Sequence, residues 1–238
     1  MRFLFALLSL VGLALVPPAQ AQLIAVPGRA APPATTDKDN LWLLDLSSGG
    51  RVTIWLRPDV APKMVERIKT LTRQRFYDGL TFHRVIEGFM AQGGDPKGDG
   101  TGASQLPDVE KEFNYLPHVR GAVAAARAEN ENSANSQFYI MFAPRLALDQ
   151  KYTVFGRVID GMQWVDAIQR GDGENGEVTA NPTRIVHAYI AADNPPAYTP
   201  AAPPAPAAQD TLPTLPGATP RAPAPAAPAP ARTPATRR

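Results

Sequence analysis

Proline is the residue that most restricts where this chain can fold, because it is concentrated towards the two ends. More than half of the 26 prolines lie in residues 193–238, a stretch built almost entirely of Ala, Pro and Thr. Proline lacks a backbone N–H and fixes its own φ angle, so this stretch favours an extended, partly polyproline II arm. Residues 22–38 have a similar composition. The sequence therefore predicts a flexible linker (22–38), a disordered tail (193–238) and one folded domain between them (39–192), long enough for a sizeable core.

The first 21 residues have the three parts of a secretory signal peptide. Met1-Arg2 gives a positive start, residues 3–16 are apolar, and Ala19-Gln20-Ala21 is a small-residue cleavage site. The apolar run is shorter than a membrane span. The alternative is an uncleaved anchor; we expect cleavage instead, with a mature chain beginning at Gln22 and no stable membrane anchor. The protein is then secreted, and periplasmic if its source is bacterial.

Cysteine is absent and the charges nearly balance, with a formal net charge of +2. No disulfide framework and no lipid-attachment cysteine is therefore expected. Lys and Arg are scattered along the chain, whereas a nucleic-acid surface needs a concentrated basic stripe. We exclude nucleic acid as a partner and expect a monomer.

The central region alternates short strand-like runs with turn residues. Eight runs are predicted as strands, at 41–46, 51–56, 80–85, 89–92, 119–125, 137–142, 152–158 and 184–190. The first two flank Ser47-Ser48-Gly49-Gly50, which is a strong hairpin signal. Many short strands separated by glycine-rich turns are typical of a sandwich or a barrel.

Two further segments have helical spacing. The first has Pro62 in its opening turn and an apolar stripe made of Val60, Met64, Val65, Ile68 and Leu71. Its opposite face is expected to carry Lys63, Glu66, Arg67 and Lys69. The second is predicted to begin at the N-cap Asp160, to bury Met162, Val165 and Ile168, and to stop at Gly171. The predicted fold is all-β with two helices: a closed eight-stranded antiparallel barrel capped by two α-helices, since closure removes exposed strand edges.

Residues 82–95 bring unusual side chains together. Residues two apart in a strand share a face, so Met90 and Gln92 point the same way, and Arg84 reaches them from a neighbouring strand after a turn at Gly88. A guanidinium beside an apolar floor and an amide suits an uncharged, hydrogen-bonding ligand such as a peptide. Taken singly, an arginine in a strand is more often a surface or salt-bridged residue, and Phe89 and Met90 would be core.

Longer motifs carry a family resemblance. They are YDGLTFHRVI (77–86), GGDPKGDGTG (93–102), SQFYI (136–140) and VFGRVIDGM (154–162). In this order and spacing they resemble the cyclophilin family of peptidyl-prolyl cis-trans isomerases, over about residues 41–190. The family fold is the eight-stranded antiparallel barrel with two capping helices, which agrees with the strand and helix pattern.

The resemblance implies a role for each matching residue. The family's catalytic arginine falls on Arg84. Its proline-pocket positions fall on Phe89, Met90, Tyr139 (usually Phe in the family) and Leu148. Its other substrate-binding positions fall on His83, Gln92, Ala128, Gln137 and Tyr152, with Ala128 contributing main-chain groups. For His83 the alternative is a structural histidine with its hydrogen bonds satisfied. Phe82 and Phe138, next to site positions, are expected in the core.

Besides Tyr139, two further positions depart from well-studied relatives. Ala147 stands where they carry a tryptophan, and Tyr152 stands where they carry a histidine. The tryptophan supports binding of the drug cyclosporin in the family, so the resemblance implies weak drug affinity here.

Peptidyl-prolyl isomerisation rotates an amide bond over a barrier of about 18–20 kcal/mol. No covalent bond breaks, so no cofactor and no metal is expected. The glycine-rich loop 93–102 lacks the Lys-Ser/Thr ending of a phosphate-binding P-loop, and Asp172, Glu174 and Glu177 lack EF-hand spacing. The sequence thus predicts an isomerase acting on proline-containing polypeptides during the folding of exported proteins. The alternative is a non-catalytic proline-peptide binding module or adaptor. The tail is expected to be a solubilising extension, with an adaptor role as its alternative.

Overall fold

The structure, a computed structural model, describes residues 30–199. The predicted signal peptide (1–21), residues 22–29 of the predicted linker and the tail from residue 200 onward lie outside the described residues. No helix among residues 30–199 combines the length and the apolar character that crossing a bilayer requires.

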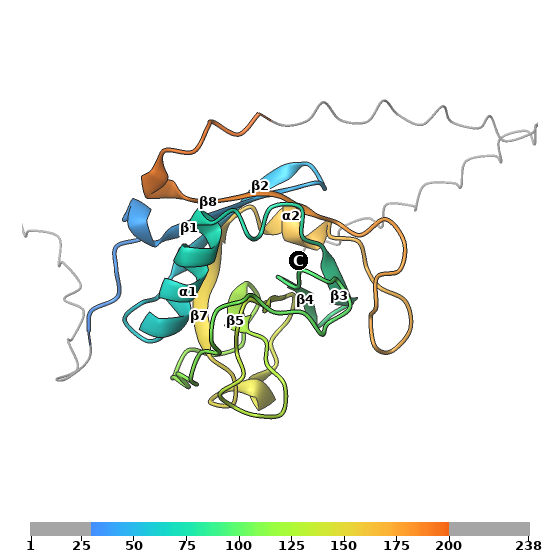
Figure 1. Ribbon diagram of the computed structural model, residues 1–238, viewed down its shortest axis with the longest axis horizontal. Helices are drawn as coiled ribbons and strands as arrows, with labels where there is room; N and C mark the ends of the chain where they lie inside the picture. Colours follow the sequence, from blue (N-terminus) through green and yellow to red (C-terminus); the bar gives the residue numbers. More distant parts are fainter. Residues whose placement is uncertain (1–29, 200–238) are drawn as a thin grey trace, which may run out of the picture. The chain divides into compact units, whose positions relative to one another are not determined.

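The described residues are organised around one eight-stranded antiparallel sheet (Figure 1). In chain order its strands are β1 (Leu41–Leu46), β2 (Gly50–Leu56), β3 (Phe82–Ile86), β4 (Met90–Gly93), β5 (Ala122–Ala125), β6 (Phe138–Met141), β7 (Val154–Asp160) and β8 (Ile185–Ile190). Across the sheet the order is β3-β4-β6-β5-β7-β2-β1-β8. Each strand overlaps the run predicted for it, and the β1–β2 hairpin forms as expected, with Leu46 opposite Gly50.

The two end strands of this order, β3 and β8, approach each other without forming a continuous ladder. An isolated bridge joins Thr81 to Arg184, and the backbone N–H of Phe82 donates to the carbonyl of Thr183 at 2.9 Å. The fold is therefore mostly β, with a curled eight-stranded antiparallel sheet and two α-helices. Full closure of the barrel stays a prediction.

Helix α1 (Pro62–Arg73) lies against β8, and α2 (Met162–Asp166) lies against β2 (Figure 1). Four residues of the predicted apolar stripe are buried in α1, namely Met64, Val65, Ile68 and Leu71. The fifth, Val60, precedes the helix and is partly buried against the core. Pro62 opens the helix, where its missing N–H has no intrahelical partner to lose.

The start of α2 corrects the sequence prediction. Asp160 is the last residue of β7, and the N-cap is Gly161, with a φ of 82° and no side-chain capping bond. A Cβ added at Gly161 would lie 2.3 Å from the carbonyl oxygen of Arg51. The chain therefore turns into the helix through a left-handed glycine, and the tight approach to β2 takes precedence over a polar cap.

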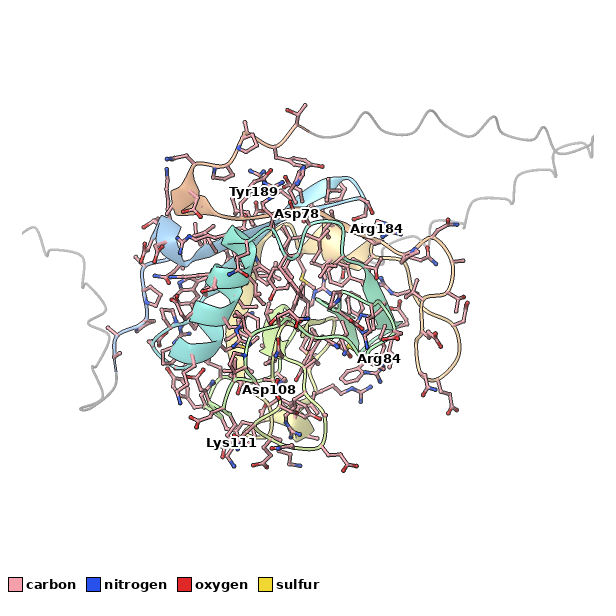
Figure 2. The ribbon with its side chains drawn as sticks, viewed as in Figure 1. Asp78, Arg84, Asp108, Lys111, Arg184 and Tyr189 are labelled. Atoms are coloured by element: carbon pink, nitrogen blue, oxygen red, sulfur yellow. The ribbon has the colours of Figure 1, made fainter. Side chains whose placement is uncertain are left out.

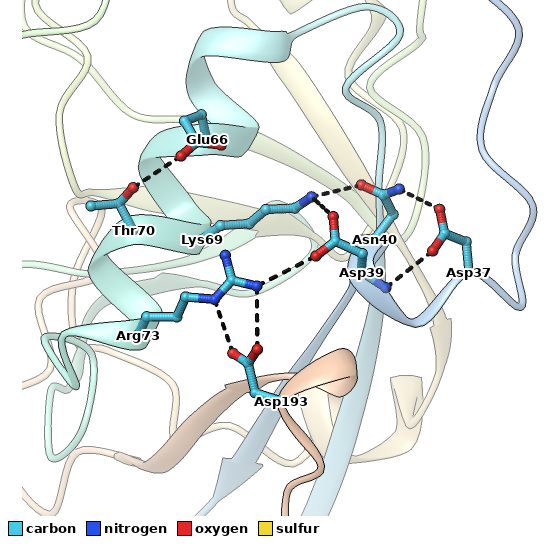
Figure 3. A network of polar contacts seen from close by, with 8 residues as sticks. All are labelled: Asp37, Asp39, Asn40, Glu66, Lys69, Thr70, Arg73 and Asp193. Atoms are coloured by element: carbon cyan, nitrogen blue, oxygen red, sulfur yellow. Dashed lines mark hydrogen bonds and ion pairs between the residues drawn. The ribbon is translucent and has the colours of Figure 1, made fainter.

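Lys69 also differs from its predicted place on the solvent-facing side of α1, since it is only 8% exposed. Its Nζ donates to Asp39 Oδ2 at 2.7 Å and to Asn40 Oδ1 at 3.0 Å (Figure 3). One turn later, Arg73 Nε donates to Asp193 Oδ2 at 3.1 Å. These contacts fasten α1 to the segments that enter β1 and leave β8. A helical pattern cannot reveal this, because a lysine stem packs on apolar surface while its charged end finds a partner.

Strand alternation separates the core from a second apolar cluster. Phe138 is fully buried in the main core, where its ring centroid lies 4.9 Å from that of Trp42 in an edge-to-face contact. Phe82 is fully buried as well, so both phenylalanines are core as predicted. The next residue of β6, Tyr139, points to the other face. There it joins a smaller cluster with Met90, Ala122, Ala124, Met141 and Val154. The sheet thus presents one face to the core and the other to the candidate site.

Candidate active site

Arg84 and Gln92 lie opposite each other on β3 and β4. The two strands are joined by a turn at Gly88, which has a φ of 66°. Arg84 Nη1 donates to Gln92 Oε1 at 3.3 Å, and Arg84 Nε donates to the carbonyl of Asn175 at 2.9 Å. The pairing of Arg84 with Gln92 across a turn at Gly88 therefore confirms the sequence pattern, and two separate contacts fix the guanidinium. Figure 2 labels Arg84 in its place on β3.

A series of amide hydrogen bonds orients this arginine. Gln137 Nε2 donates to the carbonyls of Gly100 at 3.0 Å and Gly102 at 2.8 Å, which leaves its Oε1 as an acceptor. Gln92 Nε2 donates to that Oε1 at 2.9 Å, so Gln92 Oε1 is left for Arg84. Each amide is oriented by the one before it. Among the described residues, neither bond of Arg84 uses Nη2, so this group remains available to a ligand.

A cavity of about 130 Å³ lies beside Arg84. It is lined by Arg84, Phe89, Met90, Gln92, Ala126, Arg127, Tyr139, Leu148 and Tyr152. Seven of these nine residues are among the predicted site residues; Ala126 and Arg127 are not. The volume is several times the roughly 30 Å³ that one water molecule occupies, and the lining combines apolar side chains with two guanidinium groups and an amide. The cavity is therefore suited to a small apolar ring presented next to a cation.

The other three predicted residues line neighbouring cavities. Gln137 and Ala128 face a cavity of about 310 Å³, and His83 faces one of about 410 Å³. Gln92 lines all three cavities. The ten predicted residues therefore surround one continuous region of the surface, with Arg84 and Gln92 at its centre.

Comparison with known proteins identifies this arrangement. Residues 43–190 match the family model described as cyclophilin type peptidyl-prolyl cis-trans isomerase/CLD. The chain belongs to this family. This cyclophilin is 48% identical over 172 residues to a probable peptidyl-prolyl cis-trans isomerase of Brucella suis, covering 67% of this chain and 87% of that protein. It is 40% identical over 128 residues to peptidyl-prolyl cis-trans isomerase B of Bacillus subtilis, covering 53% and 89%.

Solved structures agree with the sequence relatives. The cyclophilin AquaCyp293 from Hirschia baltica superposes with a TM-score of 0.58 at 28% identity, covering 66% of this chain and 76% of that one. A cyclophilin-type isomerase from Cryptosporidium parvum, crystallised in the presence of the dipeptide Ala-Pro, also gives a TM-score of 0.58, at 25% identity and coverages of 63% and 98%. The resemblance inferred from the motifs is confirmed.

His83 of this cyclophilin is buried, yet it is not the hydrogen-bonded structural histidine considered as an alternative. Neither ring nitrogen has a hydrogen-bond partner among residues 30–199. Burial lowers the pKa of the imidazole below its ordinary value. His83 is therefore a neutral ring at pH 7, beside Arg84 in sequence and facing the largest of the three cavities.

The main chain at Ala128 is more occupied than expected. Its N–H donates to Ser133 Oγ at 3.0 Å, and its carbonyl accepts from Arg127 Nη1 at 2.8 Å. A carbonyl oxygen has a second lone pair, so it can still accept from a peptide. The N–H is already used, and any main-chain contact at Ala128 therefore involves the carbonyl.

Arg127 belongs to a segment (126–130) that the resemblance assigns to main-chain contacts with substrate, and the sequence reasoning missed the part that its side chain takes in the site. Its guanidinium lies 4.5 Å from the ring centroid of Tyr152, and its Nη2 donates to the carbonyl of Lys151 at 3.0 Å. It lines all three cavities. The sequence places it beside Ala128 in a segment that seemed important only for its backbone, and no periodicity signals where its long side chain folds back.

The glycine-rich loop 93–102 is built around a buried carboxylate. Asp95, 1% exposed, accepts hydrogen bonds from the backbone N–H groups of Lys97 at 2.8 Å, Asp99 at 3.1 Å and Gly100 at 2.6 Å. In a phosphate-binding loop such backbone N–H groups would point towards the ligand, whereas here they point towards the Asp95 carboxylate. The loop instead presents the carbonyl of Gly100 to Gln137.

Proposed function

We propose that this cyclophilin accelerates rotation about X-Pro bonds through a hydrogen bond from Arg84 to the proline nitrogen of the twisted amide. In a planar amide the nitrogen lone pair is delocalised, and twisting restores it as an acceptor. A contact that exists only in the twisted state lowers the barrier, whereas uniform binding does not. The observation that carries the proposal is the fixed guanidinium of Arg84, which lines a cavity together with the apolar side chains of Phe89, Met90 and Leu148.

The cavity supplies the second half of the mechanism. Phe89, Met90 and Leu148 provide an apolar seat for the proline ring, and Gln92 holds Arg84 in register with it. With the ring held, the preceding carbonyl is the part that rotates. An arginine suits this position because it keeps its charge at every relevant pH and presents several donors in a rigid plane.

The test is cis-trans exchange of a short Ala-Pro peptide followed by NMR. Arg84→Ala is expected to lower kcat/KM by about a hundredfold, the cost of losing one donor to a transition state, while peptide binding persists. Arg157→Ala, which removes an exposed arginine of β7, is the matched control and keeps the native rate. A folded Arg84→Ala variant with full activity contradicts the role of Arg84. A folded native protein that binds the peptide without accelerating exchange favours the alternative, a proline-binding module.

We also propose that the enzyme acts on exported polypeptides as a monomer outside the cytoplasm, in the periplasm of a bacterium. The support for export is the signal-peptide pattern of residues 1–21. N-terminal sequencing of the protein recovered from a periplasmic fraction, together with its mass in solution, tests this. A chain starting at Gln22 is the expected result, and a cytoplasmic chain that keeps Met1 contradicts it.

Two structural predictions, closure of the barrel and the role of the tail, are also proposed. The barrel is proposed to close through the Thr81–Arg184 bridge. Hydrogen exchange tests this by measuring the protection of the Phe82 amide, which donates to the carbonyl of Thr183.

The Pro- and Ala-rich tail is proposed to be a solubilising extension. Deleting residues after Asn194 should leave peptide turnover and thermal stability unchanged, and a large change in either favours an adaptor role.

A further inference from the structure

A buried histidine lies behind the proline pocket without lining it. His118 is fully buried, and its Nδ1 lies 2.8 Å from Asp149 Oδ1. The backbone N–H of His118 donates to the same oxygen, also at 2.8 Å. A carboxylate only accepts hydrogen bonds, so Nδ1 carries the ring proton and Nε2 is left with a lone pair.

The lone pair of Nε2 faces the pocket floor. Tyr139 Oη lies 3.1 Å from His118 Nε2, so the tyrosine hydroxyl donates to the imidazole. Burial lowers the pKa of His118 and raises the pKa of Tyr139, and both rings are therefore neutral at pH 7. The result is a directed series of hydrogen bonds from Tyr139 through His118 to Asp149. A phenylalanine, the usual family residue at this position, could not begin it.

The same histidine holds both ends of a pocket wall. The 3₁₀ turn η2 (Leu146–Leu148) carries Leu148 into the cavity, and none of its three residues is buried. The residue before the turn, Arg145, donates its N–H to the carbonyl of His118 at 2.8 Å. The residue after it, Asp149, accepts from His118 twice. Lacking buried side chains of its own, the turn depends on these bonds for its position.

We propose that His118 is a positioning residue for proline binding. It joins the floor of the pocket, Tyr139, to the wall that carries Leu148, so that the pocket exists before a peptide arrives. This rests on the proposed function of the pocket and adds to it two residues, His118 and Asp149, that contact no substrate. A preformed pocket raises affinity because the peptide does not have to order the turn on binding. The rotation step is unaffected, since Arg84 and Gln92 are held separately.

The experiment compares peptide affinity with the rate of bound-state exchange, both taken from NMR spectra of the full mature protein titrated with an Ala-Pro peptide. His118→Ala and Asp149→Ala should each weaken binding about tenfold while the bound-state exchange rate stays within about twofold. His118→Asn should recover most of the affinity, because its Nδ2 takes the place of Nδ1 against Asp149. Asp160→Ala, at an exposed carboxylate of β7, is the matched control and binds as the native protein does.

Two outcomes overturn the proposal. One is a folded Asp149→Ala variant with native affinity. The other is that His118→Asn binds the peptide as weakly as His118→Ala. This result would mean that the hydrogen bond to Asp149 contributes nothing to peptide affinity. Asp149 is partly exposed, so its variant remains informative if the buried alanine at position 118 prevents folding. A native protein that binds the peptide without accelerating exchange contradicts the proposed function alone, because the affinities still test His118.

Discussion

Gln92 and Gln137 face each other across a 2.9 Å hydrogen bond, and this contact decides which way both amides point. Gln137 can offer its oxygen only because its nitrogen is held by two main-chain carbonyls. Gln92 can in turn offer its oxygen to Arg84 only because its own nitrogen is used. An amide that flips in this series would turn an N–H group towards a guanidinium, which has no acceptor.

We expect Gln137→Glu to impair catalysis without unfolding the protein. A carboxylate cannot donate to the carbonyls of Gly100 and Gly102, so the anchor of the series is lost and Gln92 no longer holds Arg84 in one orientation. The ratio kcat/KM for an Ala-Pro peptide should fall about tenfold, with a melting temperature close to native. Gln163→Glu, on the exposed side of α2, serves as the control. Native turnover by Gln137→Glu would show that the amide order is unimportant.

Lys69→Ala is expected to lower stability and leave isomerase activity unchanged. The variant leaves the buried Asn40 Oδ1 without its donor and removes one of the two side-chain partners of Asp39, the other being Arg73. The free energy of unfolding should fall by about 1–3 kcal/mol. Lys63→Ala breaks an ion pair with Glu110 in which both side chains are exposed, and solvent screening of such a pair means that the loss of stability should be clearly smaller. Denaturant unfolding of both variants measures the difference. Equal losses would show that burial of Lys69 adds nothing.

Stability should fall as the pH drops below about 6.5, the ordinary pKa of histidine. Burial lowers the pKa values of His83 and His118 in the folded protein, so the unfolded chain takes up protons more readily than the folded one. The stabilisation is complete above the unfolded pKa and is lost as the pH falls towards the folded values. Melting temperatures between pH 7.5 and pH 5 check this. His118→Asn should flatten the curve, and an unchanged slope would exclude His118 as a source of it.

Cyclosporin is expected to bind weakly, and Ala147→Trp should strengthen binding. Ala147 is exposed at the centre of η2, directly before the pocket residue Leu148. A large ring there would extend the apolar surface beside the pocket. Calorimetric titration of both proteins measures the effect. Tight binding by the native protein would mean that other residues replace the missing tryptophan.

Local patterns predicted the strands and the centre of the site. The two strand-like runs and the turn residues between them were sufficient to predict the first hairpin. The glycine at position 88 predicted the turn, and the two-residue spacing of Met90 and Gln92 placed both on one face. Together they predicted that Arg84 would face Gln92. These features depend on residues close in the sequence, where a strand's period and a turn's chemistry decide the geometry.

The features that could not be predicted from the sequence depend on contacts between residues far apart in the chain. His118 and Asp149 are 31 residues apart and meet only because of how the segment before β5 passes the turn before Tyr152. Lys69 finds its partners 29 and 30 residues earlier. In each case the side chain is compatible with several environments, and only the folded chain selects one. The N-cap at Asp160 was wrong for a related reason, because close packing against β2 decided that turn.

The loop built around Asp95 has a consequence for the conditions under which the enzyme works. Three backbone N–H groups bonded to Asp95 fix the loop. Its carbonyls orient Gln137, which orients Gln92, and Gln92 in turn accepts a hydrogen bond from Arg84. The carbonyls and the glutamine amides between Gly100 and Arg84 do not titrate, and the guanidinium stays protonated. A fall in pH therefore does not change the orientation of Arg84 through this series of hydrogen bonds. Its expected effect on the enzyme is a loss of folding.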